Sequence, residues 1–282
     1  MEKYDLKTEK LAEGIDWLSY SSKSTEEWGF PSYILDDWKP IHPLQNYTHG
    51  QKNKQGVLRF WNTTRDTQGR YVIFGGSVLP TFQEYQQEFL QWVSMKNVKP
   101  TRIDFCVDIT HSNFNPKAVV SQLRERKVKT HAKAIPKYTD DWLQGFTQYV
   151  GLKTSETYTR IYDKKVEQKT DYPWIRIETV YQGQRAEAAF ASYIQHKSAS
   201  SLIKSHVDFP EWRAWNRVLR GRKCKLHYVA KESNTRAWLL SQVCKCIAGE
   251  LLLDDDQRFL FQLMDRIREE YRVLSPDDEI DW

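Results

Sequence analysis

The sequence predicts an α+β fold: a mainly antiparallel sheet with helices on one face, followed by a C-terminal helical region. Two observations predict it. Segments that alternate apolar and polar residues, as half-buried strands do, occur in groups around single helical segments, in the order strands, helix, strand, helix, strands, helix. From about residue 204, helical patterning replaces this alternation. We therefore expect two parts, residues 1–203 with the sheet and residues 204–282 with helices.

The first half of the chain predicts strands with one helix between them. The expected elements are a strand at 14–20, a hairpin at 57–62 and 70–78, a helix that follows Thr81, and a strand at 102–110. Thr81 and Glu84 have the spacing of a capping box, and apolar residues at helical spacing continue to Val93. Pro100 separates that helix from the next strand.

The second half begins with a helix and returns to strands. Asn115 and Pro116 form an N-cap with proline at the first helical position, which opens a helix through about Lys127. The basic, turn-rich residues 128–147 are expected to form a loop. The remaining expected elements are strands at 147–151, 157–164 and 174–181 and an alanine-rich helix from about Arg185.

The composition indicates a globular protein. The 282 residues are 40% hydrophobic and 28% charged, as in chains that bury a core. No apolar stretch approaches the ~20 residues of a membrane span, and the charged first fourteen residues lack the apolar centre of a signal peptide. The four cysteines follow no disulfide framework. We therefore expect a cytoplasmic protein that does not enter membranes.

The net charge of +5 is unevenly distributed. Residues 249–282 hold eleven acidic and four basic residues, a balance of −7, so the rest of the chain carries +12. A basic body suggests a polyanionic partner such as DNA. The candidate phosphate contacts in two basic segments are Arg124, Arg126, Lys127, Lys129, Arg217, Arg220, Arg222 and Lys223. The alternative is that both segments are solvated charge runs.

Three predicted strands share a feature that concerns chemistry. Alternation gives each strand one apolar face and one face of charged residues and tyrosines. The polar sides carry Arg102, Asp104, Cys106 and Asp108 in the first strand, Tyr158, Arg160 and Tyr162 in the second, and Arg176 and Glu178 in the third. If the strands are neighbours, these residues form one surface. Carboxylates there suit Mg²⁺ or Mn²⁺, arginines suit phosphate oxygens, and a tyrosine hydroxyl beside a metal-held phosphodiester can act as a nucleophile.

The alternative for this surface is the solvated face of an antiparallel sheet, which often carries cross-strand ion pairs. Spacing also limits the metal hypothesis, because Asp104 and Asp108 lie roughly 13 Å apart along one strand at ~3.3 Å per residue. Without a bulge, at most one of them is a direct ligand. Histidine offers no metal motif, since no two histidines are spaced as His-x-His, and no P-loop or dinucleotide-binding glycine pattern is present.

Four sequence blocks resemble a known family. They are residues 15–19 (IDWLS), 101–108 (TRIDFCVD), 149–151 with 160–167 (YVG and RIYDKKVE), and 174–178 (WIRIE). Their order and spacing resemble the replication initiation factor family, which comprises the rolling-circle initiators of small plasmids and filamentous phages and related relaxases of integrative conjugative elements. The resemblance covers roughly residues 14–190.

The resemblance implies a metal-dependent endonuclease that nicks one DNA strand at an origin. The family's nucleophilic tyrosine matches Tyr162, which would form a 5′-phosphotyrosyl bond and release a 3′-OH. The matching carboxylates for a divalent metal, Mg²⁺ or Mn²⁺, are Asp104, Asp108 and Glu178. Arg160 and Lys164 match the family's block and are candidates for holding the scissile phosphate. Arg102 and Arg176 are further candidate DNA contacts, because arginines on the polar strand faces suit phosphate oxygens.

The partners expected on this basis are origin DNA, as a single strand or a hairpin, together with a host helicase and a second copy of the chain. Two alternatives remain open at the level of the sequence. One is a conjugative relaxase with the same chemistry. The other is a DNA-binding regulator that has the same fold and does not cut.

Overall fold

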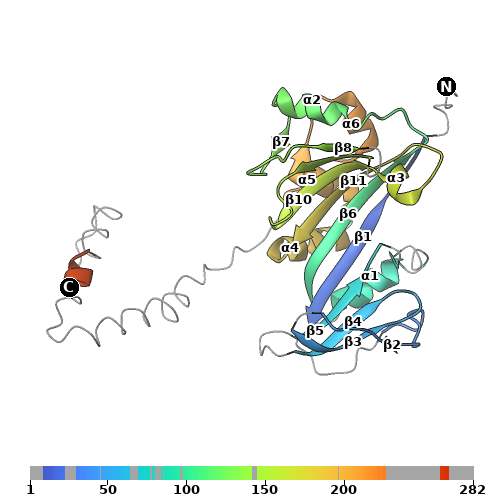
Figure 1. The fold of residues 1–282 in the computed structure, drawn as a ribbon, viewed down its shortest axis with the longest axis vertical. Helices are drawn as coiled ribbons and strands as arrows, with labels where there is room; N and C mark the ends of the chain where they lie inside the picture. The colour runs from blue at the N-terminus through green and yellow to red at the C-terminus, as the bar shows by residue number, and fades with distance from the viewer. Residues whose placement is uncertain are drawn as a thin grey trace. The chain divides into compact units, whose positions relative to one another are not determined.

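The computed structural model describes residues 9–22, 30–44, 46–63, 69–76, 78–79, 84, 86–95, 98–141, 145–195, 197–226 and 261–266. The chain divides into two compact units, residues 1–228 and residues 229–282. In the second unit, the described residues 261–266 are helical. The rest of the predicted C-terminal helical region, from residue 229 onward, lies outside the described residues. The first unit contains strands β1 to β12 and helices α1 to α6, most of which are labelled in Figure 1.

The first unit is built on an antiparallel sheet of ten strands in the order β2-β3-β4-β5-β1-β6-β11-β10-β9-β8. The strands are β1 (Lys10–Ser22), β2 (Lys39–Pro40), β3 (Tyr47–Lys52), β4 (Leu58–Thr63), β5 (Arg70–Phe74), β6 (Lys99–Thr110), β8 (Thr139–Asp141), β9 (Gly145–Val150), β10 (Thr157–Asp163) and β11 (Trp174–Gln182). The long strands β1 and β6 pair along most of their length and join the two halves of the sheet (Figure 1).

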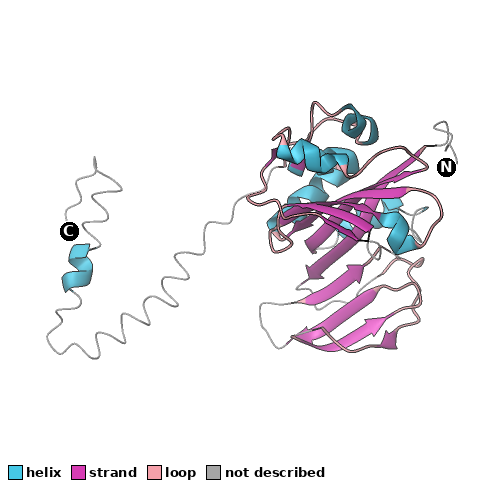
Figure 2. Ribbon diagram, turned by 45° about the horizontal axis from the view of Figure 1, so that its top comes forward, coloured by secondary structure: helices cyan, strands magenta, loops and turns pink. Residues whose placement is uncertain are grey.

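Helices cover the apolar face of the sheet. The described helices are α1 (Gln86–Met95), α2 (Ala118–Arg124), α3 (Lys164–Gln168), α4 (Gln184–Ile194), α5 (Ala199–His206) and α6 (Arg213–Val218). α4 and α5 pack against β6 and β11 (Figure 2). The layer between them contains Ile103, Phe105 and Ile109, whose side chains are fully buried. Burial of this alternating apolar set fixes the register of β6, because a slip by one residue would expose every member of it.

The predicted α+β class is confirmed, as are the predicted strand positions around the polar surface. The prediction of a loop over residues 128–147 is wrong. This stretch holds β7 (Lys129–Thr130), β8 and the start of β9, and β7 pairs with β12 (Val207–Asp208) from a distant part of the chain. Such short strands depend on their partner and leave little local pattern. The helix predicted from Pro116 begins at Ala118, after a turn in which Asn115 Oδ1 accepts a hydrogen bond from the Lys117 amide.

Two further predictions concern the boundary between the two parts of the chain and the capping box at Thr81. The boundary predicted between residues 203 and 204 falls inside α5, and the first unit continues to Tyr228. The capping box at Thr81 lies outside the described residues, and the helix it was expected to begin is described from Gln86. Within the part of the chain that the structure describes, no helix combines the length and apolar character of a membrane span.

A buried histidine joins α5 to the sheet. His206 Nδ1 lies 2.8 Å from the hydroxyl of Thr159, which in turn lies 2.7 Å from that of Thr179. Burial, together with the charges of Arg185, His131 and Lys223, lowers the pKa of His206 to about 4. The ring is therefore neutral in the folded protein at neutral pH.

The unfolded chain protonates this histidine near pH 6.5, but the folded protein does so only near pH 4. The stability of the native state is therefore full above pH 6.5 and falls as the pH drops through this window. We expect the free energy of unfolding to decrease by about 2 kcal/mol between pH 7.5 and pH 5 from this group, measured by urea denaturation. In His206→Gln, which cannot titrate, this part of the loss should be absent; an equal loss in the variant would contradict the assignment.

Candidate active site

The pairing of β6, β11 and β10 brings the predicted polar residues onto one surface. Arg176 of β11 is opposite Asp108 of β6 on one side and Tyr162 of β10 on the other. One step along the same strand face, Glu178 is opposite Arg160. We call this surface, opposite α4 and α5, the polar face. It carries Arg102, Asp104, Asp108, Arg160, Tyr162, Arg176 and Glu178, as the alternation of each strand predicted.

Tyr162 lies at the centre of this group with its ring covered by charged side chains. The ring is 6% exposed, and the guanidinium carbon of Arg160 lies 4.7 Å from its centroid. The hydroxyl donates to Glu178 Oε2 at 3.3 Å and accepts from Lys164 Nζ at 3.4 Å, both longer than optimal hydrogen bonds. Burial, and then the charge of Glu178, raise the pKa of Tyr162 well above its ordinary value. The hydroxyl is thus protonated at rest and has a carboxylate acceptor beside it.

Lys164 reaches this hydroxyl from the first residue of α3. The helix begins directly after β10, where the Asp163 side chain accepts from the Lys165 amide and caps it. Lys164 Nζ also donates to Glu167 at 2.9 Å. Although burial raises the pKa of Glu167, this contact lowers it below its ordinary value. The cap therefore holds the lysine over Tyr162.

Glu178 is the most enclosed acid of the polar face. Its side chain is fully buried, and Arg160 Nη2 lies 2.9 Å from Oε2 and 2.8 Å from Oε1. Only the Oε2 contact has hydrogen-bond geometry, so Oε1 is a buried acceptor without a hydrogen-bond donor. Burial raises the pKa of Glu178; Arg160 opposes this rise and Asp16 adds to it. A carboxylate in this position binds protons and cations more readily than an exposed one.

Asp104 forms a bidentate ion pair with Arg102. The guanidinium donates to the two carboxylate oxygens at 2.9 and 2.6 Å. Burial raises the pKa of Asp104 to about 7 despite this pair, and the charges of Glu178 and Asp16 contribute to the rise. Asp104, Glu178 and Asp16 therefore affect one another electrostatically across the polar face.

Asp108 belongs to a second, separate ion-pair group. Arg176 donates to its two oxygens at 2.7 and 2.6 Å and also bonds to Asp16 of β1. The indole of Trp174 donates to Asp108 at 2.7 Å. Arg176 thus bridges two acids that come from different strands, and Asp108 is fully engaged as a hydrogen-bond acceptor.

Asp16 is a site residue to which the sequence assigned no role. The pairing of β1 with β6 passes from Ile15–Phe105 to Trp17–Asp104, so that Asp16 is an extra, unpaired residue in a β-bulge. The bulge turns both Asp16 and Trp17 toward the polar face, where Trp17 lies 5.0 Å below the Arg102 guanidinium. In the sequence, the block at residues 15–19 pointed to this segment, but simple alternation places Trp17 with the core.

A glycine pair leaves room for the two bulge residues. A Cβ atom at Gly76 would lie 2.9 Å from Asp16 Oδ1, and one at Gly75 would lie 3.3 Å from the Trp17 ring. Any other residue at position 76 would displace the Asp16 carboxylate. Gly75 and Gly76 form a turn after β5, since the Val78 amide donates to the Gly75 carbonyl.

The carboxylates fit a divalent cation by their chemistry. Glu178 Oε1 is a buried oxygen without a donor. Burial, and then the charges of Glu178 and Asp16, raise the pKa of Asp104 although it is paired with Arg102. Hard oxygen ligands of this kind suit Mg²⁺ or Mn²⁺. As the side chains lie, each acid contacts an arginine, and no three acids, thiols or imidazoles among the described residues converge as a metal site.

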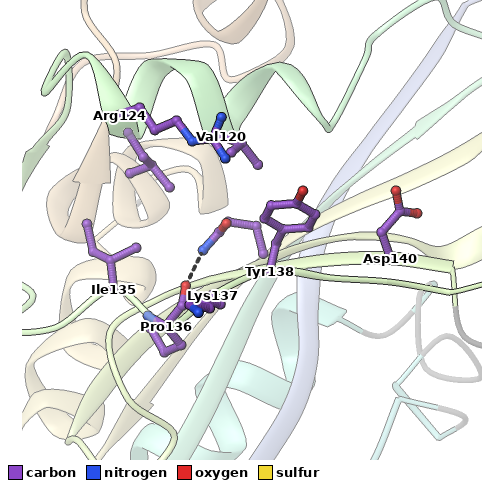
Figure 3. A pocket seen from close by; sticks show the side chains of 9 residues that line it. Val120, Arg124, Ile135, Pro136, Lys137, Tyr138 and Asp140 are labelled. Atoms are coloured by element: carbon purple, nitrogen blue, oxygen red, sulfur yellow. Dashed lines mark hydrogen bonds between the residues drawn. The ribbon is translucent and has the colours of Figure 1, made fainter.

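The predicted DNA contacts outside the polar face are dispersed. Arg124 lies on α2 and lines an open groove of about 780 Å³ with Ile135, Lys137 and Tyr138 (Figure 3). Arg126 and Lys129 are exposed, and Lys127 pairs with Glu125 at 2.6 Å. Near the end of the unit, Arg217 pairs with Glu9 at 2.9 Å, whereas Arg220, Arg222 and Lys223 are exposed.

Comparison with known proteins gives a family and a similar fold. Residues 98–248, more than half of the chain, match the family described as replication initiation factor. The structure is similar to that of a rolling circle replication initiator protein from Geobacillus stearothermophilus, with a TM-score of 0.61 and 19% sequence identity over 77% of this chain and 100% of that one. This likeness concerns the fold. Among curated proteins, none matches the chain.

Proposed function

Because the chain belongs to the replication initiation factor family, we propose that it starts rolling-circle replication by nicking one DNA strand with Tyr162. The observation that carries this proposal is the position of the Tyr162 hydroxyl, between the Glu178 carboxylate and the Lys164 ammonium. A hydroxyl between a proton acceptor and a cation has what a nucleophile for a phosphodiester requires. Tyr162 belongs to β10, which pairs with β11 on one side and with β9 on the other.

The chemistry is a transesterification. The Tyr162 oxygen attacks the phosphorus, the bond from phosphorus to the 3′ oxygen breaks, and the 5′ phosphate becomes esterified to the tyrosine. Glu178 takes the phenolic proton, because its Oε2 is the acceptor beside the Tyr162 hydroxyl. The departing 3′ oxygen takes up a proton from solvent and leaves as a hydroxyl. No ATP is needed, because one phosphodiester replaces another.

The cationic side chains support this step by their location. Arg160 covers one side of the Tyr162 ring, and Lys164 contacts the hydroxyl itself. A phosphodiester that reaches the hydroxyl meets both, and their charges stabilise the negative charge that develops on the phosphoryl oxygens. Arg102 and Arg176 hold Asp104 and Asp108 in place and border the same surface.

We assign the divalent cation, Mg²⁺ or Mn²⁺, to Glu178 and Asp104. Glu178 offers the oxygen without a donor, whereas its other oxygen accepts from Tyr162. After burial, the charge of Glu178 is a cause that raises the pKa of Asp104, so a cation beside both acids would offset their mutual repulsion. Each aspartate pairs with an arginine, but Asp108 also accepts from the Trp174 indole. When bound, such a cation polarises the scissile phosphate and favours the ionised tyrosine.

The test of the function is to identify the covalent product. The protein is incubated with Mn²⁺ and a library of single-stranded and hairpin DNA, digested with protease and nuclease, and analysed by mass spectrometry. We expect a nucleotide attached to the peptide that contains Tyr162, and a free 3′-OH on the released strand. Attachment to another residue, or cleavage by hydrolysis without an adduct, would overturn the proposal.

The role of Glu178 can be tested separately. In Glu178→Gln, nicking of supercoiled DNA is expected to fall by about 10²- to 10⁴-fold, because base and metal ligand are lost together. Mn²⁺ binding measured by calorimetry should weaken in the same variant. The control is Asp140→Asn, which removes an exposed acid paired with Lys117. Equal activity of the two variants would contradict the assignment.

A further inference from the structure

A second candidate site lies on the side of the sheet opposite the polar face. It is a cavity of about 520 Å³ lined by His131, Arg185, Ser205, Lys223 and Lys225, together with Cys224 and Leu226. We call it the basic pocket. Its described lining includes three permanent cations and a histidine, but no carboxylate. A concave surface with this charge attracts anions much more strongly than a flat one, because the low-dielectric walls focus the field.

Elements distant in the sequence build this pocket. Arg185 comes from the first turn of α4, Ser205 from the last turn of α5, and His131 follows β7. Lys223 and Lys225 lie on the segment after α6, near the end of the first unit. The polar groups at the base of the pocket are hydrogen-bonded to one another. The buried Tyr181 hydroxyl lies 2.8 Å from Ser205 Oγ and donates to the Leu202 carbonyl at 2.6 Å.

One described acid pairs with a cation of the basic pocket. Glu156, an exposed acid outside the lining, lies 3.5 Å from Arg185 Nε. The charges of this pocket also reach the buried His206 behind it. Burial lowers the pKa of His206, and the charges of Arg185, His131 and Lys223 lower it further. A group that carries negative charge would be stabilised here by the three cations Arg185, Lys223 and Lys225.

We propose that the basic pocket binds a phosphate group other than the scissile one. Phosphate oxygens match the fork of an arginine and the point charges of two lysines. The pocket opens on the helical side, because Ser205 and His206 contact the apolar face of β10 and β11 through Tyr181 and Thr159. A phosphate bound there therefore lies on the other side of the sheet from Tyr162. It comes either from DNA that continues around the unit or from a free phosphate compound.

The test compares two full-length variants that lose equal charge. Arg185→Gln/Lys225→Gln changes the basic pocket, whereas Lys39→Gln/Lys52→Gln changes two exposed lysines that face each other on β2 and β3. One arm measures affinity for a long DNA duplex at several salt concentrations. The other measures the shift of the unfolding midpoint by pyrophosphate and by ATP. Adduct formation on a short single strand is recorded for both variants.

If DNA supplies the phosphate, the slope of log affinity against log salt falls by about one in the pocket variant and not in the control. If a free compound supplies it, pyrophosphate or ATP raises the unfolding midpoint of the wild type and of the control, but not of the pocket variant. Either result supports the proposal. Two variants that behave alike in both arms would overturn it. Adduct formation on the short strand should be equal in both, so this outcome is independent of the nicking function.

Discussion

Tyr162→Phe is expected to abolish formation of the covalent protein–DNA product, with a loss of at least about 10⁴-fold in nicking rate. The ring remains, so its contact with Arg160 and its packing between β9 and β11 are retained. Only the oxygen that would attack the phosphorus is removed. The measurement is adduct yield on labelled DNA after denaturing electrophoresis, with affinity for the same DNA measured by anisotropy.

The matched control for this experiment is Tyr158→Phe. Tyr158 lies on the same strand and the same face, and its ring contacts that of Tyr149. It has no contact with Lys164 or Glu178 comparable to that of Tyr162, so adduct yield should be unchanged. Both variants should bind DNA as the wild type does. A normal adduct in Tyr162→Phe would end the proposed mechanism, and loss of the adduct in both variants would point to a general disturbance of the polar face.

The second large effect concerns stability. Arg176→Met is expected to lower the free energy of unfolding by about 3 kcal/mol or more, because it leaves two partly buried acids without their shared cation. Arg176 is 8% exposed, and its partners Asp108 and Asp16 are 16% and 20% exposed. The loss should shift the urea midpoint measured by fluorescence. Lys117→Met, which breaks the exposed pair with Asp140, should cost less than about 1 kcal/mol.

A double variant separates loss of charge pairing from loss of packing. Arg176→Met/Asp108→Asn removes one of the acids that the first change leaves unpaired. We expect it to be more stable than Arg176→Met alone, since contacting residues are not additive. If the double variant is less stable by the sum of the two single losses, the ion pair does not explain the stability of this region.

The sequence predicted the polar face correctly because the side-chain period of a strand is two. Once β6, β10 and β11 were placed, alternation decided which of Asp104, Tyr162 and Glu178 would face away from the core. It could not predict which arginine pairs with which acid. Those pairs depend on the order β6-β11-β10 and on the register between strands, which arise from contacts between distant segments.

Three features could not be predicted from local pattern, each for its own reason. The strands β7 and β12 are two residues each and exist through their mutual pairing. The bulge at Asp16 changes the face of Trp17, and the sequence around it fits an unbroken strand equally well. The cavity formed by Arg185, Ser205 and Lys223 was likewise invisible, because three separate helical or irregular segments meet there.

The bulge in β1 also changes whether odd-numbered or even-numbered residues of the strand face the core. Ile15, with an odd number, and Leu18, with an even number, both pair with core residues of β6, namely Phe105 and Ile103. A deletion of one residue between them would restore a single parity and leave only one side chain, rather than two, for the polar face. Among related chains, a one-residue gap at this point would therefore mark loss of the acid that shares Arg176, even where every catalytic residue is retained.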